Sequence, residues 1–202
     1  MRTSKLLNRR AALSVAFLAL APVACIDAGL PAGALPYNFD VLDDGQVYRT
    51  SQPTADHLET IIDTYGIRTV LNLRGENPGS DWYDAEKAVC EARGVTLISY
   101  PMSAKSLPSA DVLASVIETL KTAEYPLLIH CNGGADRTGA VSAIYRMLIL
   151  GEDRKAALAE LSPAHLHFRS YAPCMDTLAE MYEPTPEWLE WYAANVEQIQ
   201  CR

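Results

Sequence analysis

The sequence predicts an α/β fold in which a central, mostly parallel sheet is flanked by helices and the C-terminus is helical. Short apolar and β-branched runs alternate with segments of helical periodicity between residues 54 and 150, which is typical of parallel strands joined by helical crossovers. Beyond residue 137 the pattern is helical throughout. With 49% hydrophobic and 21% charged residues, the composition is globular rather than disordered.

Local signals define the elements of the N-terminal half. Residues 36–53 contain two short extended runs around a turn at 43–45, and Thr54 can cap a helix that Gly66 ends. Ser109 opens another helix after Pro108. The remaining elements are strands at 67–73, 95–100 and 126–129 and a helix at 81–93 that Gly94 ends.

The C-terminal half contains only helices and loops in this prediction. Helices are expected at 137–150 and 153–161. After a loop that holds His165, His167 and Pro173, two further helices extend to about residue 199. The ring side chains Trp188, Trp191 and Tyr192 are expected to form the packing stripe of the last helix.

The charge distribution limits the kind of partner. The formal net charge is −8, but four of the 17 Lys and Arg precede the first acid, so the rest of the chain carries 13 bases and 25 acids, close to −12. Binding of nucleic acid or an anionic membrane through general electrostatics requires an excess of Lys and Arg, so this class of function is excluded. An anionic substrate must be held by a local site.

A candidate for that local site follows the strand at 126–129. The segment His130–Gly139, HCNGGADRTG, leads from this strand into an amphipathic helix. Its glycines let successive backbone N–H groups converge on an anion, and the helix adds its positive pole. A thiolate at Cys131 is stabilised in such a field, and the planar guanidinium of Arg137 matches two phosphate oxygens. These parts predict a nucleophile joined to a phosphate cradle.

The pattern His-Cys-x2-Gly-x-Asp-Arg-Thr-Gly resembles the signature loop of the protein tyrosine phosphatase superfamily, and the layout of residues 36–182 is similar to compact bacterial dual-specificity-type members. The resemblance implies that Cys131 attacks phosphorus and forms a cysteinyl-phosphate, that Arg137 clamps the phosphate, that Thr138 assists the thiolate and that His130 holds the loop. It implies a substrate cradle made by the main chain of Asn132, Gly133, Gly134, Ala135 and Asp136, with Arg137.

The general acid is the open part of this assignment. The superfamily usually has an Asp on a separate loop, but residues 101–108 hold no acid, and Lys105 stands where it is expected. Asp136 is the alternative, because myotubularin-like and some bacterial phosphatases are assigned this loop Asp as the acid, and two anionic neighbours favour its protonated form. Asp111 and Glu76 are further candidates. An acidic leaving group would need no acid.

The sequence therefore predicts a phosphomonoesterase for phosphotyrosine, with or without phosphoserine and phosphothreonine as further substrates. An inositol phosphate or phosphoinositide is the alternative substrate, although Ala135 replaces the Lys often found in loops of that activity; Lys105 and Arg169 could supply the charge. A non-catalytic phosphate-binding module is the second alternative. The partners expected are a phosphorylated protein or a small phosphoester, and no nucleic acid.

No cofactor and no metal are expected, because the mechanism is cysteine-based and the spacing of His165, His167 and Cys174 fits no common ligand pattern. Arg74 and Glu76 follow a strand, where they form either the rim of the site or a surface ion pair.

The N-terminus predicts export. Residues 1–24 resemble a signal segment, since the uncharged apolar run at 11–26 is shorter than the roughly 18–20 residues of a spanning helix. Cys25 is either a lipid-attachment site or lost with the signal. We expect a linker at 25–35, a phosphatase domain at 36–202, and a periplasmic or lipid-anchored protein at the cell envelope. A lipid on Cys25 would be the membrane contact.

Cysteine usage agrees with an oxidising compartment. Without Cys25 four cysteines remain, of which Cys174 and Cys201 could pair and Cys90 is expected to be a buried thiol. The alternative is that all of them are unpaired.

Overall fold

The computed structural model describes residue 33 and residues 35–202, which contain a five-stranded sheet of order β1-β2-β5-β3-β4. β2, β5, β3 and β4 are mutually parallel, and β1 pairs with β2 in antiparallel fashion. The strands are β1 Asp40–Asp43, β2 Val47–Thr50, β3 Thr69–Asn72, β4 Thr96–Ser99 and β5 Leu127–His130. The predicted α/β fold with a mostly parallel sheet is confirmed.

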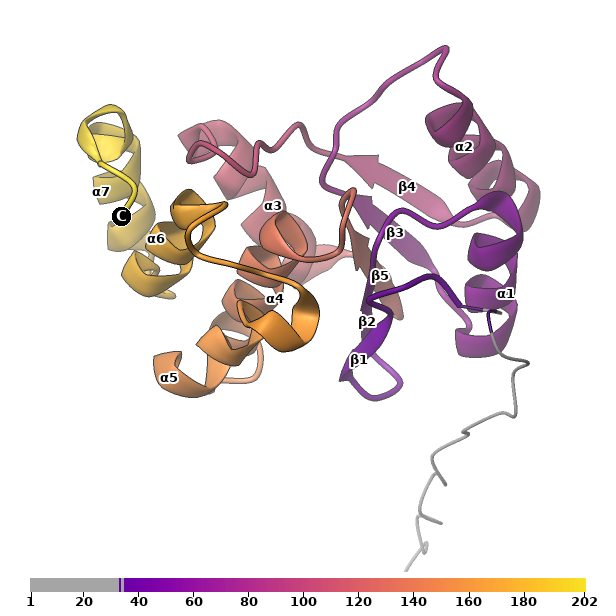
Figure 1. The fold of residues 1–202 in the computed structure, drawn as a ribbon, viewed down its shortest axis with the longest axis horizontal. Helices are drawn as coiled ribbons and strands as arrows, with labels where there is room; N and C mark the ends of the chain where they lie inside the picture. The colour runs from indigo at the N-terminus through magenta and orange to yellow at the C-terminus, as the bar shows by residue number, and fades with distance from the viewer. Residues whose placement is uncertain (1–32, 34) are drawn as a thin grey trace, which may run out of the picture. The chain divides into compact units, whose positions relative to one another are not determined.

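Helices cover both faces of the sheet (Figure 1). α1 Ala55–Tyr65 and α2 Asp81–Arg93 lie on one face, while α3 Ala110–Thr122 and α4 Asp136–Leu148 lie on the other. The C-terminal helices pack beyond α4 and α3: α5 Arg154–Ala157, α6 Pro173–Met181 and α7 Pro186–Asn195. Short 3₁₀ turns occupy Leu158–Glu160, Pro163–His165 and Val196–Gln198.

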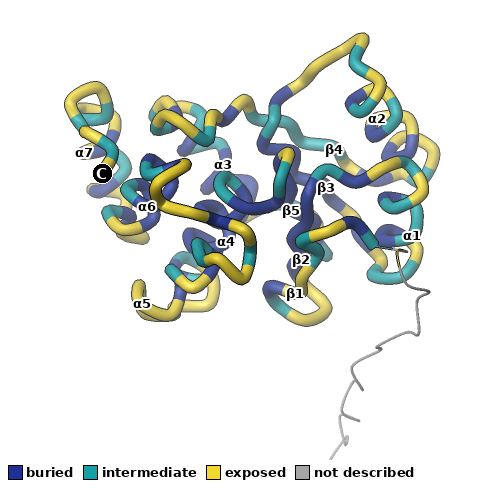
Figure 2. The backbone as a smooth tube through the Cα atoms, viewed as in Figure 1, coloured by how far each residue is buried: buried dark blue, intermediate teal, exposed yellow. Residues whose placement is uncertain are grey.

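The sheet separates two clusters of buried hydrophobic residues, one on each of its faces. Adjacent residues of a strand point to opposite faces, so Val70 packs in the cluster under α1 and α2 while Leu71 packs in the larger cluster under α3, α4, α6 and α7. Figure 2 shows the strands β2, β3 and β5 as the most deeply buried part of the body. Tyr192 and Trp188 of α7 belong to the larger cluster, whereas Trp191 is 47% exposed and lies outside the predicted stripe.

Capping explains most element boundaries. Thr54 Oγ1 accepts a hydrogen bond from the amide of His57 (3.3 Å), and Gly66 ends α1 with φ at 66°. The helix predicted at 153–161 instead tightens into 3₁₀ geometry after Ala157, as last turns often do. Pro173, expected in a loop, is the first residue of α6, where its missing N–H costs no hydrogen bond.

The described cysteines follow the first of the two predicted alternatives, in which one pair is bonded. Cys174 and Cys201 form a disulfide, and Cys90 and Cys131 are buried free thiols. The signal segment at 1–24, Cys25 and most of the linker at 25–35 fall outside the described residues. Within the described part of the chain, no helix has the length and apolar character needed to cross a membrane.

Candidate active site

The site lies at the carboxyl edge of the sheet, where the loops after β2, β3 and β5 meet. β5 is the middle strand, and Cys131 follows it directly, 2% exposed. Residues 130–139, hereafter the signature loop, lead from this strand into α4, which begins at Asp136. The carboxyl ends of central parallel strands are the usual ligand sites of α/β folds. The backbone thus places Cys131 at the N-terminal pole of a 13-residue helix.

Gly134 is the position at which the signature loop touches the sheet. Its φ of 64° is left-handed, and a Cβ there would lie 2.5 Å from the amide nitrogen of Ser51 and 2.6 Å from backbone atoms of Thr50. Its carbonyl oxygen accepts a hydrogen bond from Nη2 of Arg49 at 2.6 Å. No larger residue fits without movement of the backbone.

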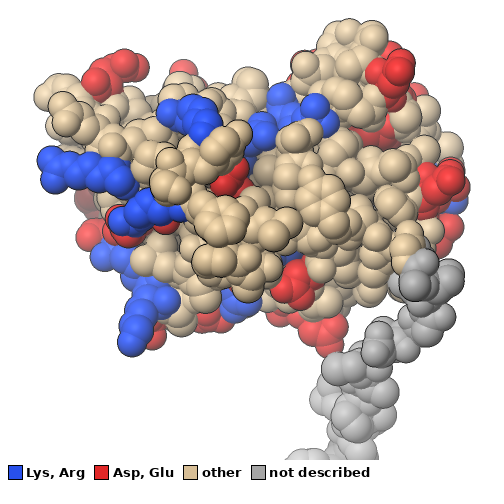
Figure 3. Space-filling view, in the orientation of Figure 1, with Lys and Arg blue, Asp and Glu red and all other residues tan. Residues whose placement is uncertain are grey.

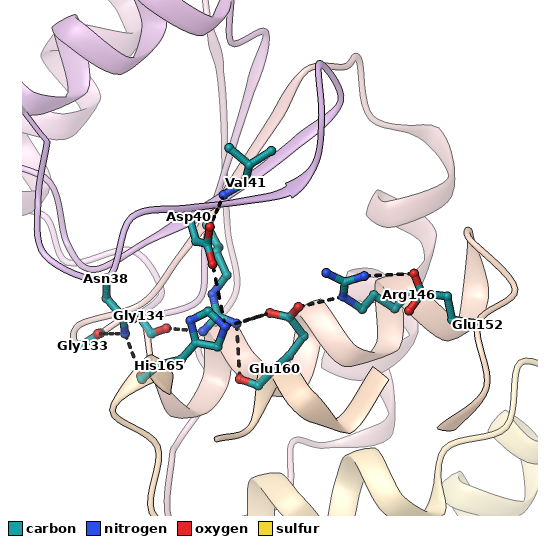
Figure 4. A network of polar contacts seen from close by, with 10 residues as sticks. Asn38, Asp40, Val41, Gly133, Gly134, Arg146, Glu152, Glu160 and His165 are labelled. Carbon is teal, nitrogen blue, oxygen red and sulfur yellow. Dashed lines mark hydrogen bonds and ion pairs between the residues drawn. The ribbon is translucent and has the colours of Figure 1, made fainter. Parts of the chain in front are cut away.

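Arg49 contacts both Gly134 and Glu160 and so is the centre of a buried polar network beside the loop. Figure 4 shows Gly134, Glu160, Arg146 and His165 of this network. Arg49 is fully buried and pairs with the carboxylate of Glu160, which also accepts a hydrogen bond from Arg146 Nε at 2.7 Å. Asn38 Nδ2 donates to the carbonyl oxygens of Gly133 (3.0 Å) and His165 (2.8 Å). The outer side of the signature loop is therefore held by side chains from β2 and from the segments before β1 and after α5.

The guanidinium of Arg137 is fixed by main-chain acceptors from two other loops. Nη1 donates to the carbonyl oxygens of Leu73 (3.3 Å) and Met102 (3.1 Å). Its Nε is buried and has no partner within residues 33 and 35–202. Because both acceptors are neutral, the positive charge of Arg137 is oriented without being neutralised, which suits a group that receives a dianionic phosphate.

His130, at the start of the signature loop, contacts a buried carboxylate of α2. Its Nε2 lies 2.7 Å from Oε1 of Glu86, a buried carboxylate of α2 that also accepts hydrogen bonds from Asn72 and Gln52. Nδ1 lies 3.3 Å from the carbonyl oxygen of Cys131. The predicted loop-holding role of His130 stays a prediction, and its contact with Glu86 was missed by sequence reasoning. The signal for Glu86 is its helical spacing from Tyr83, Val89 and Cys90, which puts this acidic residue on the buried face of α2.

Thr138 is fully buried in the first turn of α4. Its Oγ1 has no hydrogen-bond partner among the described residues. A buried hydroxyl without a partner is costly, so it is available to a group that forms during turnover. Its predicted assistance to the thiolate stays a prediction.

Asp136 is linked through His167 to a second carboxyl group, that of Asp176. The Asp136 side chain is 17% exposed, and Oδ1 lies 2.8 Å from Nδ1 of His167. Nε2 of His167 in turn lies 2.8 Å from Oδ2 of Asp176. Burial lowers the pKa of His167, but the hydrogen bonds to Asp136 and Asp176 outweigh it, and the net effect raises the pKa. Sequence reasoning placed His167 only in a loop and did not connect it with Asp136, 31 residues away.

The other candidate acids lie elsewhere. Asp111 is exposed on the first turn of α3 and lines an apolar groove with Trp188 and Leu189 of α7. Glu76 is exposed and lines a hollow with Cys90 and other residues of α2. In the described part of the chain neither carboxylate contacts the signature loop by a hydrogen bond or ion pair. Asp136 is the candidate acid that the fold places in that loop.

Cations surround the site unevenly. Arg74 is half-buried, lies 3.4 Å from the ring centroid of Trp82 and donates to Gln52 (2.8 Å). Burial lowers the pKa of Arg74, as does the nearby charge of Arg137. The amide nitrogen of Gln52 donates to the carbonyl oxygen of Asn132 in the signature loop (3.1 Å), so Arg74 lies at the rim of the site, and within the described residues it forms no ion pair with Glu76. Figure 3 shows Lys and Arg towards the middle of this face and over its helical half, with Asp and Glu mostly at the edges.

Lys105 and Arg169, the two cations that could have supplied charge for a polyanionic substrate, have partners of their own. The Lys105 ammonium lies 3.0 Å from the ring centroid of Tyr171. Arg169 pairs with Asp176 (Nε to Oδ1, 3.2 Å) and with Glu180. Among the described residues, no group of three or more His, Cys, Asp or Glu side chains is arranged to hold a metal ion.

The comparison with protein families agrees with this geometry. A family model described as a dual-specificity-type phosphatase fused to NAD+ kinase matches residues 37–172. The chain belongs to the dual-specificity branch of the protein tyrosine phosphatase superfamily. The resemblance inferred from the signature loop is therefore confirmed at the level of the family and of the fold.

Relatives of this phosphatase family differ in what their names say they act on. The dual specificity protein phosphatase TpbA of Pseudomonas aeruginosa is 32% identical over 117 residues, 57% of this chain and 49% of that protein. The inositol diphosphatase DSP1 of rice is 30% identical over 145 residues, 66% of this chain and 63% of that protein. The chain thus spans about half of the first curated relative and less than two thirds of the second.

Solved structures support the same phosphatase fold. TpbA from P. aeruginosa superposes with a TM-score of 0.58 at 22% identity, covering 78% of this chain and 91% of that one. The catalytic core of the inositol pyrophosphate phosphatase SIW14 from S. cerevisiae gives 0.59 at 23% identity, covering 83% and 98%. At this level of identity the similarity concerns the fold.

Proposed function

We propose that the protein hydrolyses phosphomonoesters, phosphotyrosine foremost and phosphoserine and phosphothreonine in addition, through a cysteinyl-phosphate intermediate. The observation that carries the proposal is the setting of Arg137. Its guanidinium is anchored by the carbonyls of Leu73 and Met102, while Nε stays without a partner in the described chain. Arg137 shares the signature loop with Cys131, which lies at the N-terminal pole of α4. This is a preformed dianion site with a nucleophile at its base.

The proposed chemistry uses these groups in two steps. The Cys131 thiolate attacks phosphorus while backbone amides of residues 132–137 and the Arg137 guanidinium bind the equatorial oxygens. The bond to the leaving oxygen breaks, and Asp136 gives that oxygen a proton. Water then attacks the cysteinyl-phosphate, Asp136 takes a proton from the water, and Cys131 leaves as the thiolate. Thr138 stabilises the thiolate as it leaves.

Phosphotyrosine is favoured over polyphosphates by the charges near the site. A second candidate function, hydrolysis of inositol phosphates, has support from the names of the rice relative and of SIW14. However, Lys105 and Arg169 are engaged by Tyr171 and by Asp176 and Glu180, and the loop carries the uncharged Ala135. TpbA has also been solved as a variant in complex with phosphotyrosine.

Hydrolysis of an aryl phosphate by the wild type and by Cys131→Ser tests the proposal, with Cys90→Ser as the matched control thiol. The proposal expects turnover by the wild type and by Cys90→Ser and no measurable turnover by Cys131→Ser. Phosphotyrosine peptides should then be hydrolysed with higher kcat/KM than inositol polyphosphates. Phosphate binding without turnover would show a non-catalytic binding module instead.

We propose further that the enzyme works outside the cytosol, as a periplasmic or lipid-anchored protein. The Cys174–Cys201 disulfide supports this location, because such bonds persist in oxidising compartments. Expression of the full chain in a Gram-negative host followed by fractionation is the test. Recovery of the enzyme in the cytosol with both thiols reduced would contradict the proposal.

A further inference from the structure

Asp136 is held in a chain of three side chains that the mechanism above does not need for binding phosphate. Its Oδ1 lies 2.8 Å from Nδ1 of His167, and Nε2 of His167 lies 2.8 Å from Oδ2 of Asp176. His167 is 2% exposed, so its ring exchanges protons with these two carboxyl groups and not freely with solvent. In the described structure, only Oδ1 of the Asp136 carboxyl has a partner, which leaves Oδ2 for a substrate.

The number of protons held by Asp136, His167 and Asp176 together limits the protonation states that these three side chains can adopt. A neutral imidazole carries one N–H, so it can donate to one carboxylate only, and the other carboxyl must then carry the proton of its hydrogen bond. An imidazolium donates to both carboxylates. The two forms contain the same number of protons and differ in the position of one proton between Asp136 and His167. With both carboxyl groups ionised and His167 neutral, one ring nitrogen would point its lone pair at a carboxylate 2.8 Å away, which is unfavourable.

The place of Asp136 in the fold makes this proton source necessary. Asp136 is the first residue of α4, so its carboxyl group lies at the positive pole of that helix. An ionised carboxylate has no proton to give to a leaving group. A neighbour that stores the proton resolves this conflict, and His167 is the titratable ring within hydrogen-bond distance of Asp136.

We infer that His167 stores the proton that Asp136 delivers to the leaving oxygen, so that the two residues act as one acid–base pair that Asp176 positions. This inference rests on the proposed function and identifies the group that supplies its proton. In this proposal Asp136 is the catalytic residue, because it gives the proton to the leaving oxygen, and His167 and Asp176 are positioning residues that act through it.

The proton moves in each step as follows. Before the reaction the three side chains hold two protons, both on the imidazolium of His167. When the bond between phosphorus and the leaving oxygen breaks, the Asp136 carboxyl takes the proton of Nδ1 and gives a proton to that oxygen. The leaving group departs as the alcohol or phenol, and His167 becomes neutral with its remaining proton on Nε2. When water attacks the cysteinyl-phosphate, the proton that the water loses passes through the Asp136 carboxyl to Nδ1 of His167. The imidazolium is then restored, with no further reactant.

The charged groups facing His167 come from three segments. Asp136 approaches from α4 and Asp176 from α6, while Arg169 of the segment before α6 pairs with Asp176 and Glu180. Arg169 Nε holds Oδ1 of Asp176 at 3.2 Å, which leaves Oδ2 directed at Nε2 of His167. The ring is therefore locked in the orientation that presents Nδ1 to Asp136.

Leaving-group dependence tests the inference. His167→Gln keeps a hydrogen-bonding side chain but removes the titrating ring, and Asp176→Asn keeps the shape of its residue while removing the charge. Each variant, with His57→Gln of α1 as the matched histidine control, is assayed from pH 5 to 9 on 4-nitrophenyl phosphate, which has an acidic leaving phenol, and on phenyl phosphate, which has a much less acidic one.

The inference expects His167→Gln to lose kcat/KM by about 10²-fold on phenyl phosphate and by far less on 4-nitrophenyl phosphate, since general acid catalysis supplies about 10²–10⁴-fold where the leaving group needs it. The basic limb of kcat/KM should move to lower pH in His167→Gln and in Asp176→Asn. Adding His167→Gln to Asp136→Asn should cause no further loss.

Equal losses on both substrates with an unmoved basic limb would overturn the inference, because a merely structural role affects both leaving groups alike. If His167→Gln fails to fold, Asp176→Asn decides through its pH profile. Wild-type turnover that depends on Cys131 keeps the proposed function in place in these cases. Absence of turnover in the wild type would overturn the proposed function, and this inference with it.

Discussion

Arg49 donates a hydrogen bond from Nη2 to the carbonyl oxygen of Gly134 at 2.6 Å, joining two residues 85 positions apart in the sequence. The same guanidinium pairs with Glu160, and burial lowers the pKa of Arg49 while Glu160 opposes that change. A fully buried cation that bonds the signature loop directly makes the geometry of the loop dependent on the charge network behind it.

Removing Arg49 should therefore destabilise the whole domain. Arg49→Met leaves the carboxylate of Glu160 buried with Arg146 as its remaining cation, and breaking a buried pair in this way costs about 3 kcal/mol of unfolding free energy. Urea unfolding measures the change. The control Arg68→Met breaks an exposed pair with Glu124 and should cost less than about 1 kcal/mol. Equal small losses in both variants would contradict the account of the network.

Gly133 and Gly134 of the signature loop should differ sharply in their tolerance of alanine. Gly134→Ala places a Cβ 2.5 Å from the Ser51 amide nitrogen at a left-handed φ, so the loop must move off the sheet. Misplaced oxyanion donors cost about 10²–10³-fold in rate, and kcat/KM should fall by at least about 10²-fold. At Gly133 a Cβ meets nothing within 4 Å, and Gly133→Ala should lose much less. Steady-state kinetics of both variants decides, and similar losses would contradict the structure.

The histidine beside Asp136 should make stability depend on pH. The pKa of His167 is raised in the folded state above its ordinary value of about 6.5, so folding takes up protons. The resulting stabilisation is fully present below about pH 6.5 and is lost as the pH rises through the raised folded-state pKa. The unfolding free energy of wild type minus that of His167→Gln should hence decline from pH 5.5 to pH 9.

His165 supplies a matched control of opposite sign. Burial, together with the charge of Arg49, lowers the pKa of His165 in the folded state. The wild type should therefore lose stability relative to His165→Gln as the pH falls below about 6.5, where the unfolded chain takes up the proton. The same trend in both variants would mean that Asp136 and Asp176 do not hold the proton on His167.

The two free thiols should differ in reactivity. Burial raises the pKa of Cys90 to about 12, so its thiolate is scarce at pH 7.5. Cys131 lies at the pole of α4 in a loop shaped for anions, and iodoacetate should alkylate it first. Mass spectrometry of the two peptides over time is the measurement, and added phosphate should protect Cys131. Alkylation of Cys90 at the same rate would argue against this environment.

Local signals account for what the sequence could predict. Thr54, Gly66 and Ser109 define helix ends through contacts within a few residues, and the structure places those boundaries where the caps predict them. The signature loop is also local, because its glycines, Cys131 and Arg137 lie within one strand–loop–helix unit. The family and its fold could be inferred from that unit.

The supporting residues could not be predicted because tertiary packing alone brings them together. His167 reaches Asp136 across 31 residues and Arg49 reaches Gly134 across 85. In the sequence His167 stands in a segment without periodicity, next to a proline-containing loop. Arg49 stands in a short strand where a charged residue predicts exposure, yet it is fully buried. Its burial depends on Glu160, which arrives from a different segment.

The most direct test of the central claim is to trap the intermediate. Rapid acid quenching of the wild type with a ³²P-labelled aryl phosphate should leave label on the chain, and peptide mapping should place it on Cys131. Cys131→Ser should show neither label nor turnover. Hydrolysis that proceeds without a phosphorylated Cys131, or at the same rate in Cys131→Ser, would contradict the assignment of this thiol as the nucleophile.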